Sequence, residues 1–244
     1  MGARGLDKEA KNMIYNNFSD IPKNKYQIVY ADPPWQFNTW SNKGRGRCPK
    51  YNTMPVSKMA ECFPVQEIIE KDCVLFMWGT WPRLKDCLKL MEEGWGFTYK
   101  TGVFDWGKVT KQSFKIFKAH CERQYTPTHE DYFEFLDQIV AMGTGYWSRG
   151  NSEFCLLGTC GKPKRKDRQP LVLDDDAFIA RSIRQLLLRP RGRHSEKPAE
   201  IRGRIIKLIG DVPRIEFFAR EHASGWDVFG DEVENENASS DGIF

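Results

Sequence analysis

Residues 26–37 read YQIVYADPPWQF, and the rest of the chain is organised around this stretch. Apolar and β-branched residues at 28–31 predict a buried strand that stops at two prolines, so Asp32 should stand at a strand end. Because consecutive prolines remove two backbone donors, DPPW should be a stiff tip that presents a carboxylate, carbonyls and an indole face. Such a tip suits a flat aromatic amine; a proline turn with an N-capping aspartate is the alternative.

Length and composition indicate a globular protein. The 244 residues suffice for one good-sized domain with its own core, and 40% of them are hydrophobic. The net charge of +4 is modest, because 37 basic residues face 33 acidic ones. No run approaches the roughly 20 apolar residues that span a bilayer, and residues 1–20 lack the apolar core of a signal peptide. We therefore expect a cytoplasmic protein with no membrane partner.

Cysteine and histidine usage argues against a metal site. The seven cysteines and four histidines are scattered, with no C-x-x-C pair and no ligand spacing. This pattern favours reduced thiols, several of them buried, over structural zinc. We expect no metal.

Strand and helix patterns alternate along the chain. A strand at 72–80, a helix at 82–93 and a strand at 98–106 have the βαβ rhythm of a parallel sheet. Residues 1–20 should form a short helix or a loose arm. Further strands are predicted at 153–160, 214–219 and 226–230, and further helices from Ser57 as N-cap, over 128–142 and from Pro198.

Basic residues gather in three segments: 108–123, 162–168 and 181–204. In the first, phenylalanines are interleaved with lysines, which suits nucleic acid because cations meet phosphates while rings stack on bases. Solvated charge is the alternative for such runs. The apolar stripe of the 128–142 helix is expected to be core, with a binding surface, such as a dimer interface, as the alternative. Two loops rich in glycine, 36–55 and 143–151, are expected to be functional or mobile.

Several blocks occur in an order that resembles a known family. YADPPW is followed by YNTM at 51–54, LFMWGT at 75–80, TGYWSRGNSEFCLLGTCG at 144–161, HSEKP at 194–198, IEFFAR at 215–220 and GWDVFGDE at 225–232. In this order the blocks closely resemble the MT-A70 family of adenine-N6 methyltransferases, over roughly residues 26–110 and 144–232.

The resemblance implies an α/β fold, the Rossmann-like fold of methyltransferases that use S-adenosyl-L-methionine (AdoMet). Its central sheet is mostly parallel with helices on both faces, and the catalytic strand precedes the cofactor-binding strand. We expect a single methyltransferase domain over 1–232, with a family-atypical insertion around 111–142. Residues 233–244 should form an acidic disordered tail.

The resemblance assigns catalysis to Asp32, Pro33, Pro34 and Trp35. Asp32 and the Pro33 carbonyl would accept the two N6 hydrogens of adenine and aim the nitrogen lone pair at the methyl group. Pro34 and Trp35 would hold the ring by stacking. The adenine must be flipped out of a duplex or already single-stranded.

The family positions for AdoMet map onto Asp32, Lys197, Phe218, Arg220, His222 and Asp231. Lys197 would pair with the methionine carboxylate and Arg220 with the ribose hydroxyls. Ala223 and Asp231 stand where better-known members carry amides. Structural alternatives remain open: Lys197 as a solvated helix-start residue, and Arg220 as a partner of Glu216 or Glu221.

Substrate and partners follow from the same resemblance. The residues expected to grip the substrate are Tyr51, Thr53, Arg149, Asn151, Arg193 and His194. DNA is favoured as the nucleic acid because the chain is compact and carries its own basic segments. The alternatives are the same methylation on RNA, or a catalytically silent nucleic-acid-binding subunit, against which the intact Asp32 argues. The family also allows a homodimer.

Overall fold

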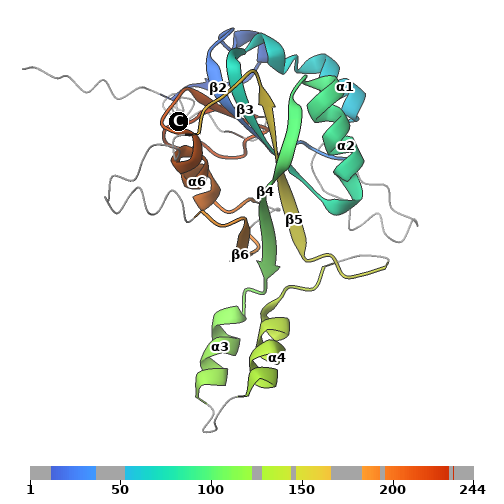
Figure 1. The fold of residues 1–244 in the computed structure, drawn as a ribbon, viewed down its shortest axis with the longest axis vertical. Coiled ribbons are helices and arrows are strands. Elements are labelled where there is room, and N and C mark those ends of the chain that lie inside the picture. Colours follow the sequence, from blue (N-terminus) through green and yellow to red (C-terminus); the bar gives the residue numbers. More distant parts are fainter. Residues whose placement is uncertain are drawn as a thin grey trace, which may run out of the picture.

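The computed structural model describes residues 12–36, 53–122, 128–143, 147–165, 183–192, 196–230 and 233. Within these residues one eight-stranded sheet has the order β1-β8-β7-β2-β3-β5-β4-β6 (Figure 1). Strand β5 is antiparallel to both of its neighbours, and the other pairs are parallel. The strands are β1 (Ile14–Tyr15), β2 (Tyr26–Ala31), β3 (Ile69–Gly79), β4 (Thr98–Val109), β5 (Ser152–Cys160), β6 (Leu186–Pro190), β7 (Arg214–Phe217) and β8 (Asp227–Phe229).

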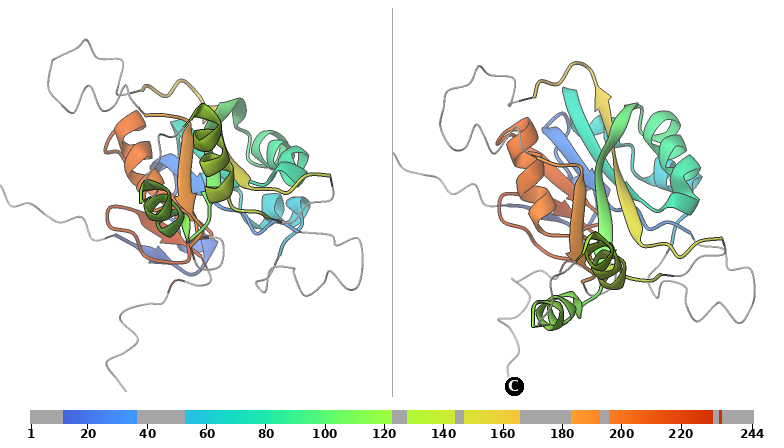
Figure 2. Two further views of the ribbon diagram at one scale, coloured as in Figure 1. Left: turned by 90° about the horizontal axis from the view of Figure 1, so that it is seen from below. Right: turned by 60° about the horizontal axis from the view of Figure 1, so that its bottom comes forward.

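Helices cover both faces of this sheet, as Figure 2 shows. Apolar side chains of β2 and β3 alternate between the faces: Val29 packs with the first core and Ile28 with the second. The first core includes Met59 of α1 and Cys87 of α2, and the second includes Ile201 of α6. The helices are α1 (Val56–Cys62), α2 (Leu84–Lys89), α3 (Ser113–Cys121), α4 (His129–Ile139) and α6 (Glu200–Ile209). The predicted Rossmann-like, mostly parallel architecture is confirmed.

The connections between these elements include short turns of tighter or wider helix. The 3-10 turns are η1 (Phe18–Asp20), η3 (Val65–Glu67) and η4 (Trp81–Arg83), and the π-helical turn η5 (Leu90–Gly94) follows α2 directly. Six cysteines lie in the described part of the chain, and all are free thiols. Burial raises the pKa of Cys73, Cys87 and Cys155, so they remain protonated.

The carboxyl ends of the parallel strands lie along one side of the sheet, which we call the strand edge. The parallel strands β2, β3, β7 and β8 all end there, and β5 begins there because Gly79 pairs with Phe154. Strand β4 ends at the same edge, since Gly107 pairs with Ser152. In open α/β sheets this is the edge at which ligands bind.

Helices α3 and α4 form a hairpin that projects from this edge, away from the rest of the sheet (Figure 1). The prediction that the stripe of the second helix is core was wrong. No residue of α3 or α4 is buried, and Phe114, Phe117, Tyr132 and Phe133 are exposed. The helix does carry an apolar stripe, but the hairpin projects away from the sheet, so the stripe is not covered by the core.

Other differences from expectation concern edges and caps. The segment near residue 14, expected as a helix or loose arm, forms the edge strand β1 beside β8. Strand β6 was not predicted. Helix α1 begins after Pro55, so Ser57 is not its N-cap, whereas Thr128 and Asp131 form a reciprocal capping box at the start of α4. Within the described part of the chain, no helix has the length and apolar character needed to cross a bilayer.

Candidate active site

Asp32 lies at the carboxyl edge of the sheet, next to the end of β7. Its backbone N–H donates to the carbonyl of Phe217, with 3.4 Å between the two atoms. This bond continues the β2–β7 ladder by one residue and brings Asp32 beside the turn that begins at Phe218. The acid and the expected cofactor segment, far apart in the chain, therefore meet at one point.

The DPPW segment folds back onto the protein. The backbone N–H of Trp35 donates to the Pro33 carbonyl over 2.8 Å, and the backbone N–H of Met54 donates to the Pro34 carbonyl over 2.9 Å. The Trp35 indole is only 4% exposed, and its Nε1 donates to the carbonyl of Trp78 over 3.0 Å. The expected protruding tip with a free indole face was wrong. Burying the ring removes a large apolar surface from water and satisfies its single donor at the same time.

Four charges of alternating sign run across the site from Asp32. Lys197 Nζ lies 2.6 Å from Oδ2 of Asp32 and 3.3 Å from Oε2 of Glu153, and Lys108 pairs with the other oxygen of Glu153. The Lys197 side chain is 11% exposed and that of Asp32 27%. Lys197 also lies over the Trp78 ring, 5.7 Å from its centroid. The alternative of a solvated helix-start lysine is excluded.

The pKa values of the buried members show how strongly the chain of charges is coupled. Burial lowers the pKa of Lys197, but the attraction of Asp32 and Glu153 outweighs burial and raises it overall. Burial alone would raise the pKa of Glu153, but the attraction of Lys197 and Lys108 outweighs burial and lowers the pKa below its ordinary value. Lys197 is therefore a fixed cation and Glu153 a fixed anion.

Glu153 and Lys108 were not identified as site residues from the sequence. Glu153 is the second residue of a mostly apolar, buried strand, and a glutamate at such a position is a signal that a cation lies opposite. Lys108 was assigned to a basic surface for nucleic acid, but its ammonium is committed to Glu153 and lies 4.8 Å from the centroid of Trp106.

Helix α6 holds Lys197 in place through a second buried ion pair. Arg202 makes two bonds to Glu216 of β7, of 2.6 and 3.0 Å, and a third of 3.0 Å to Glu221. Burial raises the pKa of Glu216, although the bonds from Arg202 oppose the rise. This pair ties the first turn of α6 to the sheet, so the preceding residues, which carry Lys197, have little freedom to move.

The expected cofactor residues follow β7 in a tight turn. Phe218 has a φ of 60°, in the left-handed region that non-glycine residues rarely adopt, and its ring packs 5.3 Å from that of Phe63. A Cβ added to Gly230 would collide with the backbone of Ala219, so the ends of β7 and β8 are in direct contact. Arg220 is half-buried and His222 exposed just beyond this turn.

The expected substrate residues are placed in part. Thr53 is half-buried next to Met54, whose N–H is bonded to the DPPW segment. Arg149 and Asn151 are exposed just before β5, and the Asn151 carbonyl accepts from the Lys108 N–H over 2.7 Å. Tyr51, Arg193, His194 and the cofactor candidate Asp231 lie outside the described residues.

The chain thus has a Rossmann-like α/β fold whose charged residues gather at the carboxyl ends of the strands, where such sheets bind ligands. The model of the MT-A70 family matches residues 26–133 and 134–232. The chain is 31% identical over 240 residues to "Type II methyltransferase M.MunI" of Mycoplasma sp, an alignment that covers 91% of this chain and 84% of the relative. The chain belongs to the MT-A70 family, as its sequence motifs predicted.

Eukaryotic relatives match over a smaller share of their own length. The chain is 28% identical over 217 residues to the "N(6)-adenosine-methyltransferase MT-A70-like protein" of Drosophila melanogaster, covering 86% of this chain and 27% of that protein. It is 26% identical over 217 residues to the "N(6)-adenosine-methyltransferase catalytic subunit METTL3" of Homo sapiens, covering 86% of this chain and 28% of that protein. The chain thus corresponds to little more than a quarter of these two relatives.

Replacing Glu153 by glutamine should leave two lysines without their shared anion. We expect the free energy of unfolding at pH 7 to fall by about 3 kcal/mol, the usual cost of breaking a buried pair on one side. Because the pKa of Glu153 is lowered in the folded protein, its contribution is present above the unfolded value of about 4.3 and is lost as pH falls through the folded pKa. The difference between parent and variant should therefore shrink on acidification.

Urea unfolding at pH 7 and at pH values down to 3 measures both effects. Glu67→Gln is the matched control: its pair with Lys23 is 2.9 Å long but exposed, so it should change stability by less than about 0.5 kcal/mol. A Glu153→Gln protein as stable as the parent at pH 7 would contradict the account, as would a difference that does not depend on pH.

Proposed function

We propose that this protein transfers the methyl group of AdoMet to the exocyclic N6 of an adenine in DNA. The observation that carries the proposal is the Asp32 carboxylate, bonded to Lys197 and adjacent to the end of β7. Lys197 engages Oδ2, and no residue that the structure describes donates to Oδ1. The arrangement offers a positioned acceptor in a partly desolvated site, which the chemistry of an aromatic amine requires.

The N6 of adenine is a poor nucleophile because its lone pair is delocalised into the ring. Oδ1 of Asp32 would accept one N6 hydrogen and the second lone pair of the Pro33 carbonyl the other, turning the nitrogen lone pair out of the ring plane. When bound, AdoMet supplies an electrophilic methyl group on a sulfonium. Transfer of this methyl group would leave a positive charge on N6, which the Asp32 carboxylate would stabilise until the N6 proton passes to solvent.

The strand edge has the features that AdoMet would need. Arg220 and His222 follow the left-handed turn at Phe218, beside Asp32, and supply donors for ribose hydroxyls. The sequence-based pairing of Lys197 with the methionine carboxylate competes with two protein carboxylates and stays a prediction. Asp32 and Lys197 act, in this proposal, on the adenine side of the site.

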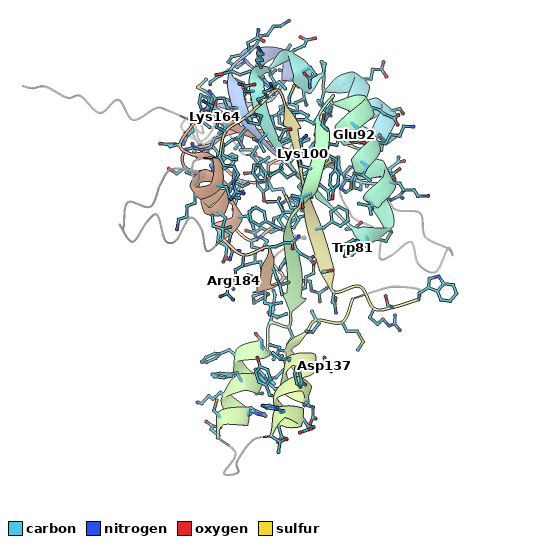
Figure 3. All side chains as sticks on the ribbon, viewed as in Figure 1. Trp81, Glu92, Lys100, Asp137, Lys164 and Arg184 are labelled. Carbon is cyan, nitrogen blue, oxygen red and sulfur yellow. The ribbon has the colours of Figure 1, made fainter. Side chains whose placement is uncertain are left out.

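The exposed cations support binding of nucleic acid, but over a smaller surface than the three basic segments of the sequence predicted. Within the 181–204 segment, four cations are committed to ion pairs: Arg189, Lys197, Arg202 and Arg204. The described part of the 162–168 segment lies at the opposite end of the sheet, where Figure 3 labels Lys164. Exposed cations at the site's end of the sheet include Arg149, just before β5, Arg191, just after β6, and Lys111 and Lys115, at the base of the hairpin.

DNA is the favoured substrate because a relative named as a Type II methyltransferase matches over most of both chains. Methylation of RNA is the second candidate function, since other relatives are named as N6-adenosine methyltransferases. The proposed chemistry is the same in both, because N6 is identical in the two polymers.

Asp32→Asn and Asp32→Ala should reduce methyl transfer at least about 100-fold, the usual effect of removing a preorganised acceptor from a reacting centre. Labelled AdoMet is incubated with matched DNA and RNA oligonucleotides, single- and double-stranded, and the nucleosides are analysed. Asp20→Asn, an exposed change in η1, serves as the control with parental activity.

The outcome separates the hypotheses. N6-methyladenine in DNA supports the proposal, and the same product in RNA alone shifts it to the second candidate. A cytosine-N4 product, or Asp32→Ala activity equal to that of the parent, contradicts it.

We propose that the protein forms a homodimer through the projecting hairpin of α3 and α4. Tyr132 and Phe133 are exposed on α4, which is acidic, while α3 carries Lys115 and Lys118. In a two-fold arrangement the basic α3 of one copy would face the acidic α4 of its partner and cover these rings.

Sedimentation of the parent should therefore show twice the chain mass of 28.4 kDa. Phe133→Asp should return it to the monomer mass, whereas Tyr99→Asp, an exposed aromatic at the other end of the sheet, should not. A parent that stays monomeric at all concentrations contradicts the dimer.

A further inference from the structure

The burial of Trp35 leaves the site without the aromatic face that the sequence predicted. Another tryptophan stands at the same edge: Trp81 begins η4, just beyond the end of β3, and its side chain is 52% exposed. Figure 3 labels Trp81 where β5 begins, at the opposite end of the sheet from Lys100 and Glu92. Trp78, Trp95, Trp106 and Trp226 are almost completely buried and belong to the core. Trp81 is half exposed, so a role in the core does not account for it.

Trp81 is exposed but held in one orientation. Its Nε1 donates to Oγ of Ser152 over 2.9 Å, and its ring packs edge-on with that of Phe154, with centroids 5.0 Å apart and planes at 64°. The single donor of the indole is therefore satisfied within the protein. What the ring still offers to solvent is apolar π surface, and a ring that is already fixed loses little conformational entropy when something stacks on it.

The position of Trp81 relative to Asp32 follows from the strand register. Ala31 pairs with Met77, so Asp32 stands level with Trp78, and Trp81 lies three residues further along, about 10 Å at the rise of a strand. The two residues are also linked through β5: Ser152 holds Trp81, and the next residue, Glu153, holds the lysine that binds Asp32. A nucleotide one or two positions from an adenine at Asp32 would therefore be within reach of Trp81.

A hollow with a net positive charge lies next to Trp35. The turn η4 ends at Arg83, whose Nη1 lies 3.0 Å from Oδ2 of Asp86, and these two residues and Lys89 line this hollow of about 280 Å³. Lys89 is exposed there, and a cation near an exposed aromatic ring is the combination used to bind single-stranded nucleic acid, in which rings take bases and cations take phosphates.

We propose that Trp81 is a stacking platform for an unpaired base of the substrate strand, either the target adenine or its immediate neighbour. The inference rests on the proposed function, because it assumes a nucleic-acid substrate at Asp32. Trp81 takes no part in the proton or methyl chemistry. Its role is to bind the substrate strand and keep the extruded base from returning to a stack.

The test compares three variants for binding a single-stranded oligonucleotide in the absence of AdoMet. Trp81→Ala should weaken binding about 5- to 150-fold, the range for loss of one base–aromatic stack. Trp81→Phe, which keeps a ring, should recover much of that loss. Tyr99→Ala, an exposed aromatic at the far end of the sheet, should bind within twofold of the parent. In turnover, Trp81→Ala should raise KM for the oligonucleotide more than it lowers kcat.

A fluorescent base identifies the stacked nucleotide. Oligonucleotides carrying 2-aminopurine at the target position, or at the position on either side, should be quenched by the parent at one of these positions. The quenching should be lost in Trp81→Ala and kept in Trp81→Phe. Equal losses in the two Trp81 variants, unchanged binding in Trp81→Ala, or quenching that survives in Trp81→Ala would overturn the inference. A parent that binds and quenches but methylates no adenine would instead contradict the proposed function and leave Trp81 as a base-binding residue.

Discussion

The Lys197 ammonium, shared between Asp32 and Glu153, is the interaction on which the site depends. It joins β2, β5 and the segment before α6, three parts of the chain that are distant in sequence. An isolated lysine at this depth would be driven toward its neutral form, and an isolated glutamate likewise, so each charge is stable only because the others are present. The same pairing fixes one carboxylate oxygen of Asp32 and so orients the other.

The position of Lys197 depends in turn on how α6 packs. Ile201 and Ile205 bury one side of the helix against the sheet, and Arg202 fixes its first turn to Glu216 of β7. Because β7 also ends beside Asp32, a single buried ion pair aligns both the cation and the expected cofactor turn with the acid. The packing of α6 in the second core thereby fixes the position of Lys197 relative to Asp32.

The sequence allowed the sheet, the family and the location of Asp32 to be predicted, because buried strands and DPPW are local signals. The orientation of Trp35 could not be predicted, since it depends on the Trp78 carbonyl that accepts its N–H, a contact across 43 residues. For the same reason Lys108 was assigned to a surface rather than to Glu153. Counting basic residues overestimated the nucleic-acid surface because partners such as Asp32, Glu153 and Glu216 come from distant strands and strand ends. The exposure of α4 also lay beyond the sequence, because an apolar stripe does not show whether a core lies opposite it.

A double-mutant cycle tests most directly whether Lys197 acts through Asp32. It compares the single-turnover rate of methyl transfer in Asp32→Asn, Lys197→Met and the combination. If the two residues work as one unit, the double variant should be about as slow as the slower single variant, with a large coupling energy. Independent effects, with the two losses multiplying in the double variant, would contradict the account.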